Sequence, residues 1–440
     1  MNRLICLLLA YWRAKRFHFE HRDALEQHQT RALKRFMQTL CERSAYFSTF
    51  KGLPLSAWPT MDKSMMIAHF DTMNTAGLHW PQVMSVAMQA ELQRDFTPDL
   101  DSITGKITVG LSSGTSGQRG AFVVSAQERA KWAGIMLAKA LPGGLFSGER
   151  AALFLRANSQ LYTSVRHRWL ALEFFDLFLP FSEHLPRLEH YHPTVLIAPA
   201  QVLRALALAH QSGQIQLKPH KVISVAEVLE PQDRQLIEAV FSQPVHEIYQ
   251  ATEGFLASTC AQGVLHLNEE YLHIEAEWLD TEHKRFVPII TDFSRLTQPI
   301  VRYRLNDVLV RRELPCTCGS ACLALERIEG RCDDQLLLPT RSGAFVQVFA
   351  DVLTRTFARL LPLHADYRLL QTGQSTLALF AEIRASQLEP LRDGLVQILS
   401  NQGIDTKQLT WTLSDQMPPL DATQKRRRII RTTANKVFAT

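Results

Sequence analysis

A loop rich in glycine and hydroxyl residues is the stretch of this sequence best suited to binding an anion. Residues 112–120 read Ser-Ser-Gly-Thr-Ser-Gly-Gln-Arg-Gly, and β-branched or apolar residues at 103–109 and 121–124 predict a strand on each side. Glycine lets the backbone approach closely, so that successive N–H groups surround a phosphate, and hydroxyls add donors. No Gly-Lys-Ser/Thr follows, which excludes the P-loop of kinases and GTPases. A plain β-hairpin turn is the alternative.

Two other motifs place a carboxylate at the end of a predicted strand. Residues 249–254 read Tyr-Gln-Ala-Thr-Glu-Gly, in which Glu253 could hold Mg²⁺ and Tyr249 could stack on a base. A strand-end turn with a solvated glutamate is the alternative there. Residues 302–307 read Arg-Tyr-Arg-Leu-Asn-Asp, and Asp307 could accept hydrogen bonds from ribose hydroxyls. A surface ion pair with one of the flanking arginines is the alternative for that aspartate.

A set of cysteines and one histidine has the composition of a closed metal site. Cys260 and His266 lie near each other in the sequence, and Cys316 and Cys318 follow much later. Three thiolates and one imidazole match a structural zinc site, with Cys322 as a substitute ligand. Buried free cysteines are the alternative. We predict one structural, non-catalytic zinc.

The composition indicates a globular protein with more than one domain. The chain has 440 residues, a net charge of +5 and seven scattered cysteines, which predict a reducing, cytoplasmic setting rather than a disulfide scaffold. The net charge is only mildly positive, and few aromatic residues are interleaved with the basic residues of its densest stretch, 425–428. We therefore expect no nucleic-acid partner. The apolar start, 4–12, is shorter than the roughly 20 residues of a spanning helix and lacks the pattern of a secretory signal. It predicts a packed or amphipathic helix with at most peripheral membrane contact.

Hydrophobic periodicity predicts an α/β protein. The first hundred residues are mostly helical. Short apolar strands then alternate with helices, which predicts parallel sheets covered by helices. These strands are expected at 151–155, 194–198, 221–225 and 245–249. Antiparallel strands follow at 273–278, 285–290 and 300–305. The remainder predicts a helix at 345–361, strands at 367–370 and 376–383, a helix at 387–399 and a strand at 409–413. We therefore expect a large N-terminal domain, 1–330, and a small, mobile α+β C-terminal domain, 331–440.

In this order the motifs resemble the adenylate-forming superfamily, and in particular its phenylacetate–CoA ligase-like branch. The matching elements are the loop at 112–120, Val-Ala-Glu-Val at 225–228 in place of a Gly-Ala-Glu-Pro adenine loop, the motifs at 249–254 and 302–307, Gly-Arg-Cys-Asp-Asp at 330–334, and a late lysine. The resemblance implies an ATP-dependent, AMP-forming ligase that joins a carboxylic acid to AMP and passes the acyl group to a thiol such as coenzyme A. Two alternatives stay open: the acyl group could pass to the thiol of a carrier protein, or the chain could be a non-catalytic nucleotide-binding relative in a biosynthetic complex.

The resemblance also assigns roles to residues of this sequence. The phosphate loop would use Ser112, Ser113, Gly114, Thr115, Ser116 and Gly117. Ala226 and Glu227 would flank the adenine, and Tyr249 would stack on it. Thr252 and Glu253 would hold phosphate and Mg²⁺.

The same resemblance places further roles towards the C-terminal end. Asp307 would bind the ribose, Arg331 the ribose or phosphate, and Asp333 would be the hinge. Lys425 would bridge the α-phosphate and the carboxylate, with Lys436 as a fallback and a solvated basic tail as the alternative. The chain departs from the family pattern at Gln250, which stands where a glycine is usual.

The acid and the oligomeric state are less defined. We expect an aromatic or hydrophobic acid lined by residues 156–162, Trp169 and Phe174-Phe175, although three nearby arginines would suit a more polar acid. A homodimer is left open.

Overall fold

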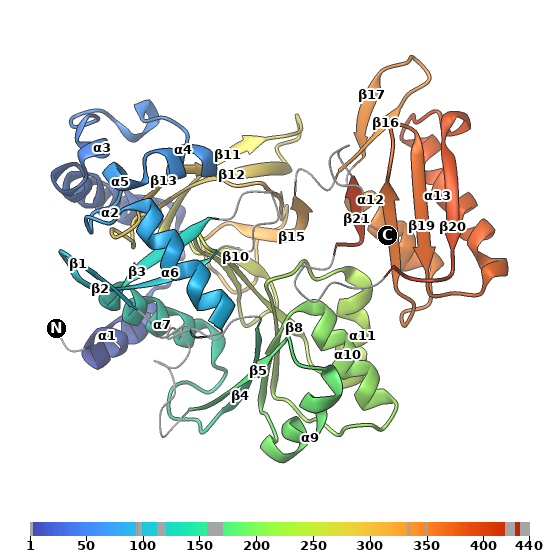
Figure 1. Ribbon diagram of the computed structural model, residues 1–440, viewed down its shortest axis with the longest axis horizontal. Coiled ribbons are helices and arrows are strands. Elements are labelled where there is room, and N and C mark those ends of the chain that lie inside the picture. Colours follow the sequence, from blue (N-terminus) through green and yellow to red (C-terminus); the bar gives the residue numbers. More distant parts are fainter. Residues whose placement is uncertain are drawn as a thin grey trace.

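The computed structural model describes residues 3–93, 95, 99–111, 120–155, 170–331, 335–348, 350–418 and 427–431. A large body holds the N-terminal helices and a twisted central sheet, and the C-terminal elements gather at one side of it (Figure 1). In the described ranges no helix is long and apolar enough to cross a bilayer.

The N-terminal hundred residues are mostly helical, as predicted. The helices are α1 (Arg3–Arg16), α2 (Arg22–Arg43), α3 (Ala45–Ser48), α4 (Lys63–Ala68), α5 (Phe70–Met73) and α6 (Trp80–Gln93). A three-stranded antiparallel sheet follows, with β1 (Asp99–Ser102), β2 (Gly105–Leu111) and β3 (Ala121–Ser125). The strands expected on both sides of the glycine-rich loop are therefore present.

One half of the central sheet is parallel. Its strands are β5 (Ala171–Asp176), β4 (Arg150–Leu155), β6 (Val195–Ala198), β7 (Lys221–Val225) and β8 (Val245–Ala251), in that spatial order. Successive residues of a strand face opposite layers, so Ala151 packs towards α1 and α7 (Ala126–Ala140), while Phe154 packs towards α10 (Ala200–Gln211) and α11 (Pro231–Phe241). Helix α9 (Phe181–Tyr191) completes that second layer. The predicted helix-covered parallel sheet is confirmed.

The other half of the same sheet is antiparallel. It contains β9 (Gly254–Thr259), β10 (Leu265–Leu267), β15 (Ala324–Arg331), β14 (Asp307–Arg311), β12 (Arg285–Asp292) and β11 (Leu272–Trp278), with β13 (Ile300–Arg304) paired to β12. The predicted antiparallel region is thus present, but it continues the parallel sheet through the β8–β9 pair. Apolar residues of α2 to α5 cover one face of this half.

The C-terminal elements have their own core. A hairpin of β16 (Leu336–Pro339) and β17 (Phe345–Val348) precedes α12 (Ala350–Leu360), and a four-stranded sheet has the order β20-β19-β18-β21. Its strands are β18 (Tyr367–Gln371), β19 (Thr376–Ala381), β20 (Thr410–Ser414) and β21 (Ile429–Arg431), covered by α13 (Leu388–Asn401). The helix predicted at 345–361 is wrong in its first turn, because residues 345–348 form the strand β17, which pairs with β16.

A buried polar cluster joins α10 and α11 to the C-terminal elements. We call it the junction cluster, and its members are Arg204, Gln232, Asp233, Asp366 and Arg428. Arg428 donates to the carboxylates of Asp233 and Asp366, at 3.0 Å each. Arg204 Nη1 donates to the Leu363 carbonyl at 2.8 Å, and Gln232 Nε2 to the Pro362 carbonyl at 2.8 Å. Burial alone would lower the pKa of Arg428, but the two carboxylates raise it.

Candidate active site

A cavity of about 1460 Å³ opens where β7 and β8 end. Ligands of open α/β sheets bind beyond the carboxyl ends of parallel strands, which is where the motifs at 225–228 and 249–254 lie. The wall also receives residues from α1, α2, α4, α7, β13 and β15, and Arg427 from the C-terminal segment. The cavity is therefore shared by most layers of the molecule.

Tyr249, Asp307 and Arg331 meet at one end of this cavity. The Tyr249 hydroxyl donates to the Asp307 carboxylate, and Arg331 Nε lies 3.9 Å from Asp307 Oδ1. Burial, reinforced by the Asp307 charge, raises the pKa of Tyr249 well above its usual range. Asp307 and Arg331 are register partners on β14 and β15, so the two side chains are placed by one strand pair.

The alternative for Asp307, an ion pair with a flanking arginine, is wrong. Arg302 pairs with Glu275 at 2.8 Å and Arg304 pairs with Glu277 at 2.6 Å. Both glutamates are on β11, which like β13 pairs with β12. Asp307 also opens β14, whereas the sequence predicted that it closes a strand. Its carboxylate is thereby turned to the cavity wall rather than to the surface pairs.

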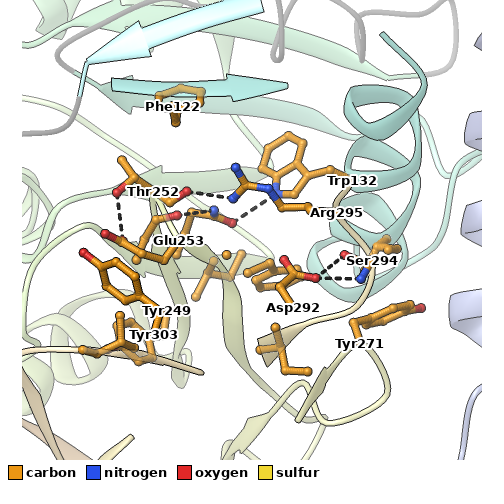
Figure 2. Close-up of a pocket in the computed structure, with 18 of the residues that line it drawn as sticks. Phe122, Trp132, Tyr249, Thr252, Glu253, Tyr271, Asp292, Ser294, Arg295 and Tyr303 are labelled. Atoms are coloured by element: carbon orange, nitrogen blue, oxygen red, sulfur yellow. Dashed lines mark hydrogen bonds between the residues drawn. The ribbon is translucent and has the colours of Figure 1, made fainter. Parts of the chain in front are cut away.

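Glu253 occupies the tight turn between β8 and β9. Thr252 Oγ1 donates to Glu253 Oε2 at 2.8 Å (Figure 2). Burial, reinforced by the Glu253 charge, raises the pKa of Tyr303 above its usual range. Burial lowers the pKa of the nearby Lys63, an effect partly offset by the Glu253 charge. Glu253 is half-buried rather than a solvated turn residue. An oxygen-rich setting of this kind has the donor chemistry that Mg²⁺ prefers.

Ala226 and Glu227 follow β7 and line the cavity. Ala226 has a φ of 66°, in the left-handed region that turns the chain sharply. Glu227 Oε2 accepts from the Gln201 backbone N–H at 3.3 Å, and so satisfies a free donor in the first turn of α10. The sharp turn and this contact hold the segment against the cavity.

The apolar part of the cavity was not found from the sequence. Trp132 on α7 donates its indole N–H to Gln250 Oε1 at 3.0 Å, and Ile135 and Tyr271 also line the cavity. The residue that replaces the usual glycine thus fixes an aromatic side chain. By contrast Phe175, expected to line the acid pocket, is fully buried and stacks on Phe154 at 4.7 Å between ring centroids. Alternation along β5 turns it to the α10 side of the sheet.

Glu128 ties α7 to the segment after β12. It closes a capping box with Ser125, and its Oε1 accepts from the backbone N–H groups of Leu296 and Thr297 at 2.6 and 2.9 Å. Burial alone would raise the pKa of Glu128, but these hydrogen bonds lower it. From the same segment, Arg295 Nη1 donates to the Thr252 carbonyl at 2.8 Å (Figure 2). The Glu253 turn is thus braced from α7.

Burial raises the pKa of Asp292, which also lines the cavity and accepts from Ser294. Its neighbour Arg295 opposes that rise.

Several predicted residues lie outside the described residues. These are Ser112, Ser113, Gly114, Thr115, Ser116, Gly117, Asp333, Lys425, its fallback Lys436, and residues 156–162 and Trp169 of the expected acid pocket. The two strands that flank the glycine-rich loop do reach the cavity, since Leu111 on β2 and Phe122 on β3 line it. Arg427, two residues after Lys425, lines it as well.

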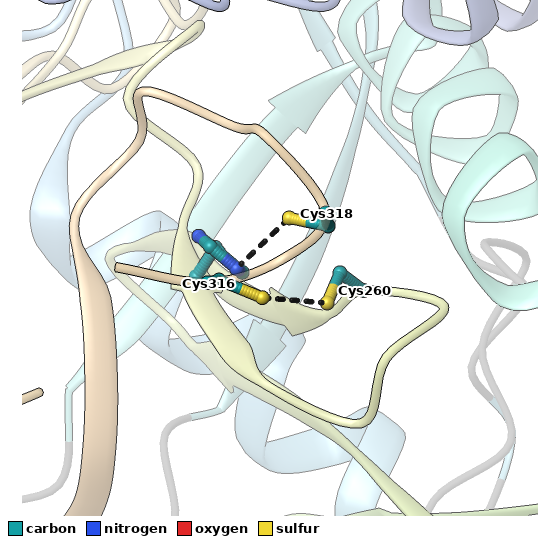
Figure 3. Close-up of side chains that lie close together, drawn as sticks. Cys260, Cys316 and Cys318 are labelled. Atoms are coloured by element: carbon teal, nitrogen blue, oxygen red, sulfur yellow. Dashed lines mark hydrogen bonds between the residues drawn. The ribbon is translucent and has the colours of Figure 1, made fainter. Parts of the chain in front are cut away.

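Cys260, His266, Cys316 and Cys318 come together at the tips of two hairpins (Figure 3). One ligand atom from each lies within 4.8 Å of all the others. Cys260 Sγ is 3.7 Å from Cys316 Sγ, and Cys318 Sγ is 3.5 Å from His266 Nε2. Tetrahedral zinc with Zn–S bonds of about 2.3 Å needs sulfur atoms about 3.8 Å apart. The donor set and spacing therefore fit zinc.

Neighbouring groups orient this cluster. His266 Nδ1 lies 3.0 Å from the Cys322 carbonyl, which leaves Nε2 facing the thiols. Cys322 is not part of this group, so its predicted role as a substitute ligand finds no support in the geometry. Burial, reinforced by Cys316 and Cys260, raises the pKa of Cys318 to about 11.

No protein-family model matches this sequence, and no curated protein matches it significantly. Solved structures do match. A 2-hydroxyisobutyryl-CoA ligase in its postadenylation state has a TM-score of 0.63 and 15% identity, covering 93% of this chain and 88% of that one. Its thioesterification state, with an acyl-AMP and CoA, has a TM-score of 0.52 at 15% identity, covering 92% and 90%.

Two further structures are similar over a smaller part. The amide bond synthetase McbA from Marinactinospora thermotolerans has a TM-score of 0.52 and 12% identity, covering 72% of this chain and 66% of that one. A benzoate CoA ligase from Burkholderia xenovorans has a TM-score of 0.50 and 14% identity, covering 73% and 68%. The chain has the fold of the adenylate-forming acyl- and aryl-CoA ligases. At these identities the similarity establishes the fold, and the phenylacetate–CoA ligase-like branch stays a prediction.

Proposed function

We propose that this protein is an ATP-dependent, AMP-forming carboxylic acid ligase that activates its acid as an acyl-adenylate and passes it to a thiol. The observation that carries the proposal is the meeting of Tyr249, Glu253, Asp307 and Arg331 around one cavity. They lie at the ligand-binding edge of a fold that adenylate-forming ligases share.

The polar residues divide the work of adenylation. Asp307, held by Tyr249, accepts from the ribose hydroxyls, and Arg331 beside it contacts ribose or phosphate. Ala226 and Glu227 flank the adenine. The loop at 112–117 surrounds the outer phosphates, and Lys425 bridges the α-phosphate and the acid. Positioned donors of this kind stabilise the charge that gathers during phosphoryl chemistry.

Glu253 and Thr252 fit a hard cation through their oxygen atoms, since a carboxylate and a hydroxyl lie 2.8 Å apart at the turn. Mg²⁺ bound there would neutralise phosphate charge. The acid carboxylate would approach from the apolar side, where Trp132 and Tyr271 form the wall. That apolar wall supports a hydrophobic or aromatic acid. Domains 1–330 and 331–440, with Asp333 as the hinge, complete the proposal.

The test is acid-dependent ATP–pyrophosphate exchange over a panel of aromatic and aliphatic acids, with Glu253→Gln as the inactive control. Exchange with one class of acid would support the proposal and identify the substrate. Mg·ATP binding without exchange for any acid would overturn it and favour a non-catalytic nucleotide-binding protein.

The acceptor is tested separately, with acyl-adenylate formed in place. We propose coenzyme A as the acceptor, with a carrier-protein thiol as the competing outcome. Product with coenzyme A supports the first. Product only with a purified acyl carrier protein would overturn it.

We also propose that the cluster of Cys260, His266, Cys316 and Cys318 holds one structural zinc. Metal analysis of protein purified without added metal should find about one equivalent. Cys318→Ser should lower that content and the melting temperature, while Cys41→Ser, a thiol outside the cluster, should change neither. Wild-type protein without zinc would contradict the assignment.

A further inference from the structure

The first helix, α1, exposes an apolar face to solvent. Leu4, Ile5, Leu9 and Trp12 are 44%, 49%, 57% and 52% exposed. At 3.6 residues per turn they fall within an arc of about 140°. The opposite face, which includes Leu7 and Ala14, is buried. Helix α1 lies against α7 (Figure 1). This helix is therefore apolar towards the protein and towards solvent, which is unusual for a surface helix.

The charges on α1 are all positive. Arg3, Arg13, Lys15 and Arg16 are exposed, and the helix contains no acidic residue. The charged groups of two of them lie over aromatic rings, with Arg13 Cζ 4.9 Å from the centroid of the Phe17 ring and Lys15 Nζ 5.9 Å from that of the Tyr11 ring. Exposed leucines and a tryptophan with flanking cations are the composition of helices that lie in the headgroup region of anionic bilayers.

The same helix forms one wall of the cavity. Cys6, Leu9, Ala10 and Arg13 line it from α1, and Leu9 is exposed at the same time. The cavity therefore opens next to the apolar face, not on a distant surface. Phe17 and Phe36 extend the apolar lining inward from this side.

We propose that α1 docks the protein on an anionic lipid surface and presents the cavity to it. Resting on the proposed function, the acid is then an amphiphilic acid drawn from that surface. Fourteen residues span about 21 Å, less than the roughly 30 Å hydrocarbon core, so α1 lies along the surface. The absence of acidic residues in α1 matches an anionic bilayer in charge.

Vesicle flotation in the absence of nucleotide and acid tests the docking. Wild-type protein should float with phosphatidylcholine vesicles containing about 30% phosphatidylglycerol, and less with phosphatidylcholine alone or at high salt. Ile5→Glu with Trp12→Glu should reduce binding at least tenfold; neither residue lines the cavity. The matched control is Leu92→Glu with Ile103→Glu, two apolar residues 81% and 83% exposed elsewhere, which should bind like wild type.

The docking would be overturned if the wild type did not float, or if both double variants lost binding equally. It would also be overturned if the wild type were a dimer that did not bind vesicles and that Ile5→Glu with Trp12→Glu dissociated. Circular dichroism melting confirms that the variants fold. If the apolar variant fails to fold, Lys15→Glu with Arg16→Glu carries the test, and should reduce binding to the anionic vesicles at least fivefold.

The substrate half has its own assay. With a long-chain acid held in anionic vesicles, pyrophosphate exchange by Ile5→Glu with Trp12→Glu should fall at least fivefold, while exchange with a water-soluble acid of the same class should be unchanged. Equal exchange with the vesicle-borne acid would overturn the supply from the bilayer. Vesicle binding without exchange for any acid would leave the docking standing and defeat the proposed function instead.

Discussion

The junction cluster and the cavity cluster, by which we mean Tyr249, Glu253, Asp307 and Arg331, both contain arginine and carboxylate side chains. The junction cluster is closed to solvent, whereas the cavity cluster is open to it. In the junction cluster Arg428 is 4% exposed and Asp233 is 1% exposed, and each meets an opposite charge. At the cavity the side chains of Arg331 and Asp307 are 28% and 23% exposed, and Arg331 Nε lies 3.9 Å from Asp307 Oδ1. A buried ion pair favours one arrangement of the chain, because separating its two members leaves a buried charge without a partner. A looser, half-exposed pair leaves donors and acceptors available to a ligand.

The largest expected effect is in the closed cluster. Arg428→Met leaves Asp233 and Asp366 buried without their main cation and should cost about 3–5 kcal/mol in the free energy of unfolding. Urea unfolding measures this, with Arg359→Met, an exposed arginine on α12, as the control. A loss below about 1 kcal/mol would mean that the junction is not closed in solution.

In the open cluster, Glu253→Gln should affect chemistry and not folding. It keeps the shape of the turn but removes the charge, so acid-dependent pyrophosphate exchange should fall by about 10²–10³-fold with the melting temperature unchanged. Glu282→Gln, on an exposed turn, is the matched control. Full activity of the Glu253 variant would remove the proposed cation role.

The stability that the hydrogen bonds of Glu128 provide next to the cavity should depend on pH. Because hydrogen bonds lower the pKa of Glu128 below its ordinary value of 4.5, its stabilisation is complete above that value and is lost as the pH falls through the folded-state pKa. Glu128→Gln should therefore cost about 2 kcal/mol at about pH 7 and much less at about pH 3.5, measured by urea unfolding.

Glu389→Gln, an exposed glutamate in the first turn of α13, is the control for that comparison. A Glu128→Gln penalty that does not shrink in acid would show that shape, and not charge, holds the segment.

The smallest effect is expected at Tyr249. Tyr249→Phe removes one donor to Asp307 and should raise the KM for ATP about fivefold with little change in kcat, since one hydrogen bond contributes about 1 kcal/mol. Tyr191→Phe, which loses a hydroxyl contact away from the cavity, should leave both constants unaltered. A fall in kcat instead would place the tyrosine in the chemical step.

Local patterns predicted the elements better than the contacts between them. The strand before Tyr249 and the helix after Pro231 follow from short-range alternation and from proline at a first turn. The Trp132–Gln250 hydrogen bond joins residues 118 apart, and Lys63 approaches Glu253 from an N-terminal helix. No periodicity within a segment encodes such pairs, so the acid side of the cavity was placed wrongly at Phe175.

The cysteine cluster has a consequence for the far end of the sheet. Cys316 and Cys318 lie in the connection between β14 and β15, whose opposite end carries the register pair of Asp307 and Arg331. Cys260 likewise lies beyond β9, whose opposite end adjoins Glu253. A cation bound between the tips of these two hairpins would fix the hairpins relative to each other. It would thereby set the relative positions of Glu253, Asp307 and Arg331 at their opposite ends. Removal of this cation with a chelator should therefore weaken the affinity for nucleotide before the protein unfolds globally.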